Sequence, residues 1–272
     1  AISRATPLAQ FERAFVEGYA PLRRALMRGE KLGAAGVARA EAVAACDAFS
    51  ALFSRAYSDA LPTFGATGKH PRMIFDLFTQ TQRCARVHGA RTSQILLVDG
   101  LRWDLGRRLR EQLARACGQN AVCVEELPLW SVLPTTTMVQ LDALARGEDA
   151  LRAPIHPERE TEIVRGRSLD VLRRMRIGHR DVLKLDRIEG WLRQPGPSEG
   201  ARIDQMAMDL SPLFEAHLSK TPARTLVVIA GDHGFALPEG DSRESTGPAT
   251  QGGASPEEVI VPMQAWLVGG VH

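Results

Sequence analysis

Two short apolar runs constrain the fold of this chain of 272 residues more than any other feature. Gln94–Val98 has the sequence QILLV, and Thr225–Ala230 has the sequence TLVVIA. A short run that is apolar at successive positions, without a polar alternation, is typical of a strand that is buried on both faces. Such strands belong to a sheet that lies between layers of helices.

Further segments support the same architecture. Leucines recur at every fourth position from 101 to 113, which predicts an amphipathic helix directly after the first strand. Weaker strand candidates are Ala121–Val124, Val182–Ile188, Val259–Pro262 and Ala265–Val268. Buried strands that alternate with helices predict an α/β sandwich with a mostly parallel central sheet.

The first third of the chain has a different pattern. Residues 1–90 are rich in Ala, Arg, Leu and Glu, and their apolar positions recur at helical spacing. Gly65–Pro71 has the composition of a loop, and Met73–Val87 is predicted to be a further helix. We therefore expect a helical N-terminal region over 1–90 and an α/β domain over 91–272.

Composition narrows the class of protein. Hydrophobic residues make up 44% of the chain, and no run approaches the roughly 18 apolar residues that a membrane span needs. A net charge of +2 is too small to indicate nucleic-acid binding by itself. The four cysteines form no C-x-x-C pair, which favours free thiols in a reducing cytoplasm. The chain starts without Met or a signal pattern, so we expect a piece of a longer cytoplasmic protein.

Three residues with metal-binding chemistry follow the two clearest strands. Asp99 comes directly after Gln94–Val98, and Asp232 with His233 follows Thr225–Ala230. Ligands of open α/β sheets bind at the carboxyl ends of strands, and carboxylate plus imidazole suits zinc or manganese. The alternative is structural: Asp99 could cap the next helix, and Asp232 could belong to an ordinary turn.

A threonine segment is a candidate for anion chemistry. Pro134–Thr137 has the sequence PTTT and precedes an amphipathic stretch, so its threonines are expected at a helix N-terminus. A hydroxyl beside a divalent cation can act as a phosphoryl acceptor, because the cation lowers the hydroxyl pKa. The alternative is a plain threonine N-cap.

The order of these segments resembles the PglZ domain family of the alkaline phosphatase superfamily. The resemblance extends over residues 94–268. Val98–Asp104 (VDGLRWD) resembles the family's first motif, Pro134–Thr137 its nucleophile segment, Ala230–Phe235 (AGDHGF) its SDHGF motif, and Gly252–Pro262 (GGASPEEVIVP) its terminal HGGLSPEEVIVP segment.

The resemblance implies an alkaline-phosphatase-like α/β/α sandwich with a two-metal phosphoryl-transfer site. Asp99, Asp232 and His233 match the ligands of one metal ion. Thr137 matches the nucleophile, with Thr135 and Thr136 as alternatives. Asp186 matches the first ligand of the other metal ion.

The second metal site departs from the family pattern. Gly190 stands where a histidine should follow Asp186 by four residues, and Gln251 stands where a histidine should open the terminal motif. The sequence therefore predicts one bound ion, zinc or manganese. Arg102, Arg187 or Arg243 could partly replace the missing charge. The Cys-x-Pro-x-Arg motif of the one-metal sulfatases is absent, which disfavours sulfate ester cleavage.

Two functions follow from the resemblance. One is a phosphatase or phosphodiesterase that uses Thr137. The other is a pseudoenzyme that binds a phosphorylated ligand or protein partners, because PglZ proteins are associated with phage-defence systems. The basic segment from Arg165 to Arg180 could contact nucleic acid, although such a run is more often a solvated helix face.

Overall fold

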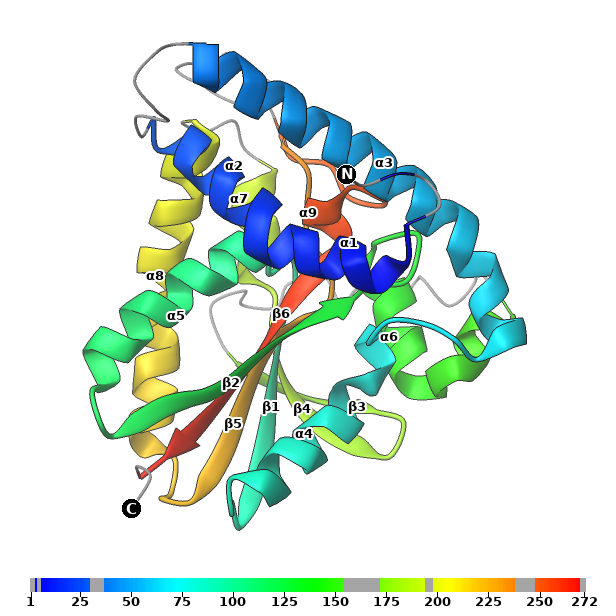
Figure 1. Ribbon diagram of the computed structural model, residues 1–272. Helices are drawn as coiled ribbons and strands as arrows, with labels where there is room; N and C mark the ends of the chain where they lie inside the picture. The colour runs from blue at the N-terminus through cyan, green and yellow to red at the C-terminus, as the bar shows by residue number, and fades with distance from the viewer. Residues whose placement is uncertain are drawn as a thin grey trace.

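A single mixed sheet forms the centre of the computed structural model (Figure 1), which describes residues 3, 6–29, 37–153, 172–193, 198–237 and 248–269. Its strand order is β2-β6-β5-β1-β4-β3. The strands are β1 (Thr92–Val98), β2 (Ala121–Trp130), β3 (Arg173–Ile177), β4 (Arg180–Leu185), β5 (Thr225–Gly231) and β6 (Ile260–Val268).

The expectation of a mostly parallel sheet is correct only for the centre. Strand β1 pairs in parallel with both β4 and β5, whereas β2–β6, β5–β6 and β3–β4 are antiparallel. The connections explain the difference. Only Gly178 and His179 separate β3 from β4, and so short a connection can join only antiparallel strands. Strand β6 starts at the end of the sheet where β5 finishes, so it runs back along β5.

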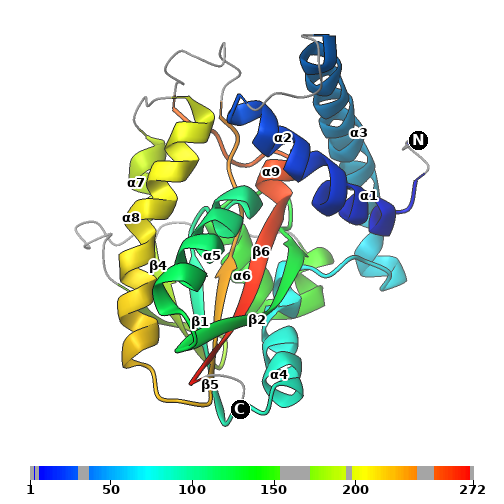
Figure 2. The same cartoon turned by 60° about the vertical axis from the view of Figure 1, so that its left-hand side comes forward.

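Helices cover both faces of the sheet, which confirms the α/β sandwich (Figures 1 and 2). Side chains of β1 alternate between the two sides: Leu96 and Val98 pack in one hydrophobic cluster, and Ile95 and Leu97 in the other. This two-sided burial is why the strand is apolar at successive positions. The first cluster includes side chains of α5 (Trp103–Cys117) and α8 (Glu199–Lys220).

The second cluster joins the sheet to the N-terminal helices. The helical character expected for residues 1–90 is confirmed in the described part. The ring of Phe53 stacks on Trp130 of β2 with centroids 5.0 Å apart, so helix and sheet share one core. The elements of this region are α1 (Leu8–Ala14), a π-helical turn (Phe15–Tyr19), α2 (Ala20–Met27), α3 (Val37–Thr67), a 3-10 turn (Ile74–Asp76) and α4 (Leu77–Val87).

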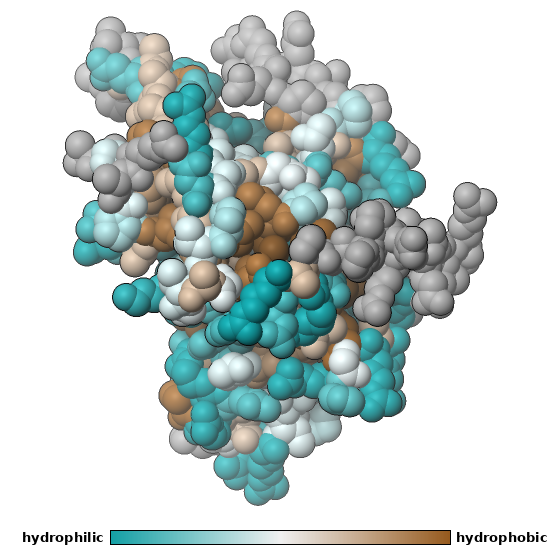
Figure 3. Space-filling view, turned by 90° about the vertical axis from the view of Figure 1, so that its right-hand side faces the viewer, coloured by the Kyte–Doolittle hydropathy of each residue, from teal (hydrophilic) through white to brown (hydrophobic). Residues whose placement is uncertain are grey.

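The remaining helices are short and lie near strand ends: α6 (Thr137–Arg146), followed by a 3-10 turn (Gly147–Leu151), α7 (Arg187–Leu192) and α9 (Pro256–Val259). The face in Figure 3 shows an apolar area near its centre with hydrophilic residues around it. In the described part of the chain, no helix has the length and apolarity needed to cross a membrane.

Several predicted boundaries are wrong. The segment expected as a basic helix face contains strand β3, while its residues 165–171 lie outside the described ranges, as does Arg243. Strand β4 ends at Leu185 rather than Ile188, because Asp186 is the N-cap of α7. The two C-terminal strand candidates form one strand, β6. Helix α3 continues to Thr67, so the loop predicted from Gly65 starts later.

Candidate metal centre

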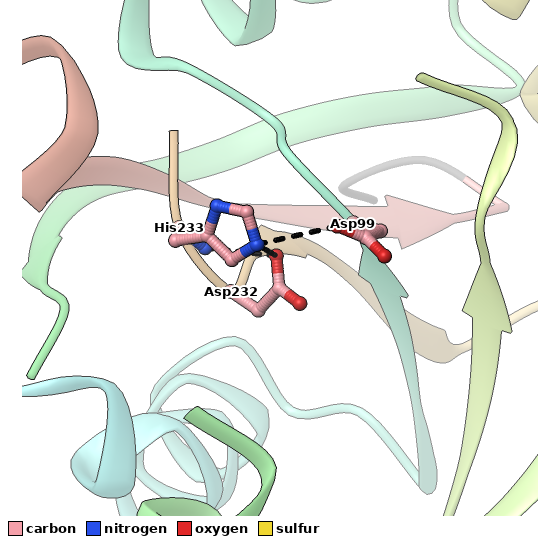
Figure 4. A group of neighbouring side chains, drawn as sticks. All are labelled: Asp99, Asp232 and His233. Carbon is pink, nitrogen blue, oxygen red and sulfur yellow. Dashed lines mark hydrogen bonds and ion pairs between the residues drawn. The ribbon is translucent and has the colours of Figure 1, made fainter. Parts of the chain in front are cut away.

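Three acidic residues follow the three parallel strands at the centre of the sheet. Asp99 follows β1, Asp186 follows β4, and Asp232 follows β5. Asp99, Asp232 and the neighbouring His233 are buried, and one ligand atom from each lies within 4.8 Å of the others (Figure 4). The sequence placed these three residues together, and the structure confirms that they are neighbours. Asp186 is not a member of this group.

Thr137 lies at the edge of the same group. It is the first residue of α6, as the sequence predicted, and its Oγ1 lies 3.0 Å from Asp99 Oδ1 and 3.1 Å from His233 Nε2. The other threonines of the segment differ. Thr135 donates to the Gly253 carbonyl at 2.8 Å and accepts from the Gly252 N–H at 3.0 Å, and Thr136 is the N-cap of α6. Of the three, Thr137 is the one whose hydroxyl contacts both Asp99 and His233.

The backbone fixes the orientation of the ligand side chains. Asp232 Oδ1 accepts hydrogen bonds from the N–H groups of Gly100 at 3.0 Å and His233 at 2.8 Å. Its other oxygen, Oδ2, is buried and has no hydrogen-bond partner within the described ranges. His233 Nδ1 lies 2.7 Å from the Gly234 carbonyl, to which it donates, so Nε2 faces Asp99 and Thr137.

These residues fit a divalent cation. A buried carboxylate oxygen without a donor costs free energy unless a cation or a proton reaches it. An imidazole whose Nδ1 proton is held by a carbonyl offers Nε2 as a ligand, which is the usual arrangement at metal sites. One carboxylate oxygen from each of Asp99 and Asp232, together with a ring nitrogen of His233, forms a mixed oxygen and nitrogen set that suits zinc or manganese.

The electrostatic environment of the metal-free site shows how strongly its charges interact. Burial would lower the pKa of His233, but the carboxylates of Asp232 and Asp99 raise it to about 9. Burial would raise the pKa of Asp99, but Lys184 and His233 hold it well below its ordinary value. For Asp232 burial dominates and raises the pKa. Because only the neutral imidazole is a metal ligand, a cation at this site must displace the Nε2 proton that the two carboxylates stabilise on His233.

Lys184 is the residue that the sequence interpretation missed. Its side chain is only 1% exposed, its Nζ lies 3.2 Å from Asp99 Oδ2, and it also contacts Asp186 Oδ1. Asp186 Oδ2 pairs with Arg173 at 2.6 Å. Burial would lower the pKa of Lys184, but the carboxylates raise it. The available signal was a lysine within a predicted buried strand, two residues before a candidate ligand.

Arg102 and Arg187, two of the arginines considered as substitute cations, have other contacts. The Arg102 guanidinium pairs with Asp104 at 2.7 Å and Glu199 at 2.9 Å and lies over the Phe235 ring. Arg187 lies over the ring of Trp191, 5.0 Å from its centroid. None of these contacts is to Asp99 or Asp232.

The second metal site of the family pattern is not assembled. Gly190 lies within α7 and has no side chain to offer, and Gln251 is exposed. Both oxygens of Asp186 are paired with cationic side chains.

Neither a scan against protein-family models nor a search of curated proteins found a match to this chain.

Proposed function

We propose that this chain is a metal-dependent phosphohydrolase of the PglZ type, with Thr137 as the nucleophile and one bound divalent ion. The observation that carries the proposal is the position of Thr137 Oγ1, 3.0 Å from Asp99 Oδ1 and 3.1 Å from His233 Nε2, at the start of α6. The four motifs that resemble PglZ domains give independent support. A zinc or manganese ion held by Asp99, Asp232 and His233 would polarise the Thr137 hydroxyl and a phosphate oxygen.

The residues of the chain define the remaining steps. The Thr137 hydroxyl donates to Asp99 Oδ1, which leaves its oxygen lone pairs free to approach phosphorus. Attack forms a bond from Thr137 Oγ1 to phosphorus, the ester oxygen departs with the bonding electrons, and the threonine proton passes through solvent to the departing oxygen. Water then cleaves the phosphothreonine to restore Thr137 and release phosphate or a phosphomonoester. The free N–H groups at the start of α6 favour an anion at this position.

Hydrolysis of p-nitrophenyl phosphate and bis-p-nitrophenyl phosphate by zinc-loaded protein tests the proposal. Thr137→Val should lose activity by about three orders of magnitude, because the nucleophile is removed while the shape is kept. Thr137→Ser should keep much of the activity. Thr136→Ala is the matched control, because the Thr136 side chain makes no capping hydrogen bond, and it should hydrolyse both esters at the wild-type rate. Equal activity of Thr137→Val and wild type would contradict the proposal.

A second candidate is a pseudoenzyme that binds a phosphorylated ligand or protein partners, as in a phage-defence assembly. The pairing of both Asp186 oxygens with Lys184 and Arg173 favours it, because a two-metal enzyme would need this carboxylate for an ion. Zinc binding and phosphate binding without turnover of either ester would support the scaffold over the enzyme.

A further inference from the structure

The buried lysine of strand β4 occupies a defined place in the candidate site. Lys184 lies within β4, Asp186 follows the end of this strand, and Lys184 Nζ contacts Asp186 Oδ1. Strand β1 lies on one side of β4 and β3 on the other, and Lys184 is in register with Leu97 and with Arg173. Lys184 therefore forms an ion pair with Asp99, which follows β1, and Arg173 of β3 forms an ion pair with Asp186.

The two oxygens of Asp99 face different partners. Oδ1 lies 3.3 Å from His233 Nε2, and Oδ2 lies 3.2 Å from Lys184 Nζ. A divalent ion that shares Oδ1 with His233 therefore leaves the contact between Oδ2 and the ammonium intact. Two-metal sites place two cations a few ångströms apart so that both charges act on the transferring group. Here the ammonium lies on the side of Asp99 that faces Asp186.

Charge balance favours one ion. Asp99, Asp186 and Asp232 contribute three negative charges, and Lys184 with Arg173 contributes two positive charges, which leaves a formal charge of −1. One divalent ion changes this to +1, which favours a phosphate anion. A second divalent ion beside Lys184 would place two cations against one carboxylate pair, which is unfavourable where burial leaves little water to screen the repulsion.

We propose that Lys184 is a fixed cation that takes the place of the second metal ion, so that the chain binds one divalent ion rather than two. The inference rests on the metal centre of the proposed function and concerns the half of it that the family pattern assigns to Asp186. It also accounts for Gly190 and Gln251, because a lysine that neutralises Asp186 removes the need for two histidine ligands.

The test is the number of zinc ions bound per chain, measured by inductively coupled plasma mass spectrometry after equilibration with zinc and gel filtration. The wild type should bind one ion. Lys184→Met should bind two, because Asp99 Oδ2 and Asp186 Oδ1 become available, and adding Asp186→Asn to Lys184→Met should restore one. Lys220→Met, which changes an exposed lysine at the end of α8, is the matched control and should keep one.

The outcomes separate this inference from the proposed function. A single ion in folded Lys184→Met would overturn the role of Lys184 and leave the hydrolase proposal intact. Two ions in the wild type would overturn both the role of Lys184 and the single-ion part of the proposed function, while Thr137 as the nucleophile would still be decided by the ester assays. An ion-free wild type would overturn the metal centre on which both rest. If Lys184→Met lacks a folded circular dichroism spectrum until zinc is added, recovery with two ions bound supports the inference. If Lys184→Met stays unfolded in zinc, the number of zinc ions bound by the wild type decides whether the chain takes one ion or two.

Discussion

The Ser131 hydroxyl donates a hydrogen bond of 2.8 Å to the backbone carbonyl of Asp232, although the two residues are 101 positions apart. The Ser131 carbonyl in turn accepts a hydrogen bond of 2.6 Å from the Tyr57 phenol on α3. Ser131 follows β2 and precedes the threonine segment. These two bonds therefore connect the loop of the proposed nucleophile, the loop of two candidate metal ligands and helix α3.

Replacement of Ser131 should weaken metal binding without touching a ligand. We expect Ser131→Ala to lower the free energy of unfolding by about 1 kcal/mol and zinc affinity by about tenfold or more, because the Asp232 loop loses a buried support. Calorimetric zinc titration and urea unfolding measure the two effects. Ser54→Ala is the matched control, since the Ser54 hydroxyl bonds to the Ser50 carbonyl within α3, and its zinc affinity should equal that of the wild type. Unchanged zinc affinity in Ser131→Ala would contradict the role assigned to this contact.

The glycine after the ligand pair is required by a close backbone approach. A Cβ atom at Gly234 would lie 1.9 Å from the Glu257 carbonyl oxygen, so Gly234→Ala must displace one of the two backbones. We expect a loss of about 3 kcal/mol or more in the free energy of unfolding, together with loss of zinc binding. Gly18→Ala is the matched control: apart from its own stretch of helix, no described residue has an atom within 4 Å of an added Cβ, and the variant should gain about 0.5 kcal/mol. Equal stability of the two variants in urea would exclude the close approach.

An ion pair between helices α2 and α5 should make the packing of the N-terminal helices depend on pH. The hydrogen bond and charge of Arg24, at 2.7 Å from Glu111 Oε1, lower the pKa of the Glu111 carboxyl. A lowered carboxyl pKa contributes stability above the unfolded value of about 4.3, and this contribution is lost as the pH falls through the folded pKa.

The corresponding variant is Glu111→Gln. Because both side chains are about a third exposed, we expect it to cost at most about 1 kcal/mol at pH 7, with the difference from wild type vanishing at acidic pH. Urea unfolding at a series of pH values measures this difference. Glu17→Gln is the control, since Glu17 and its partner Arg13 are more than 60% exposed, and it should match the wild type throughout. A cost for Glu111→Gln that is independent of pH would argue against the ion pair.

The central part of the fold and the metal centre were predictable because their signals are local. A strand buried on both faces is apolar at successive positions, so β1 and β5 could be located, and the residues after them had to meet at one edge of the sheet. Asp99, Asp232 and His233 followed from that rule. The choice of Thr137 among three threonines came from a family resemblance, and its contacts with Asp99 and His233 could be seen only in three dimensions.

Strand β3 and the role of Lys184 were not predicted from the sequence, because both depend on contacts between strands. Strand β3 contains three arginines among five residues, and only its pairing with β4 across a short turn makes it a strand. Lys184 is a charged residue in a buried strand. The two carboxylates that stabilise it, those of Asp99 and Asp186, follow different strands and are far from each other in the sequence. Charge pairing of this kind has no periodicity, so hydrophobic patterns cannot predict it.

Removal of the Asp232 charge should change the free energy of unfolding, relative to the wild type, in opposite directions with and without metal. Asp232 Oδ2 is buried and unpartnered within the described ranges, so in the metal-free chain the carboxylate is a destabilising group. Asp232→Asn keeps the oxygen that accepts from Gly100 and His233 but removes the charge. In the presence of a chelator, we therefore expect it to be as stable as the wild type or more stable. In zinc at about 100 times the dissociation constant, the wild type should gain about 2.7 kcal/mol and Asp232→Asn far less.

Urea unfolding midpoints with chelator and with zinc measure both effects on the same samples. His217→Asn is the control, because His217 bonds to Gln94 on β1 at 3.0 Å, away from the metal centre, and it should gain as much from zinc as the wild type. An equal zinc increment in Asp232→Asn and wild type would place the ion elsewhere. If Asp232→Asn is the more stable protein in chelator and the wild type is the more stable protein in zinc, the ion must neutralise the buried Asp232 charge. That result would identify Asp232 as a metal ligand.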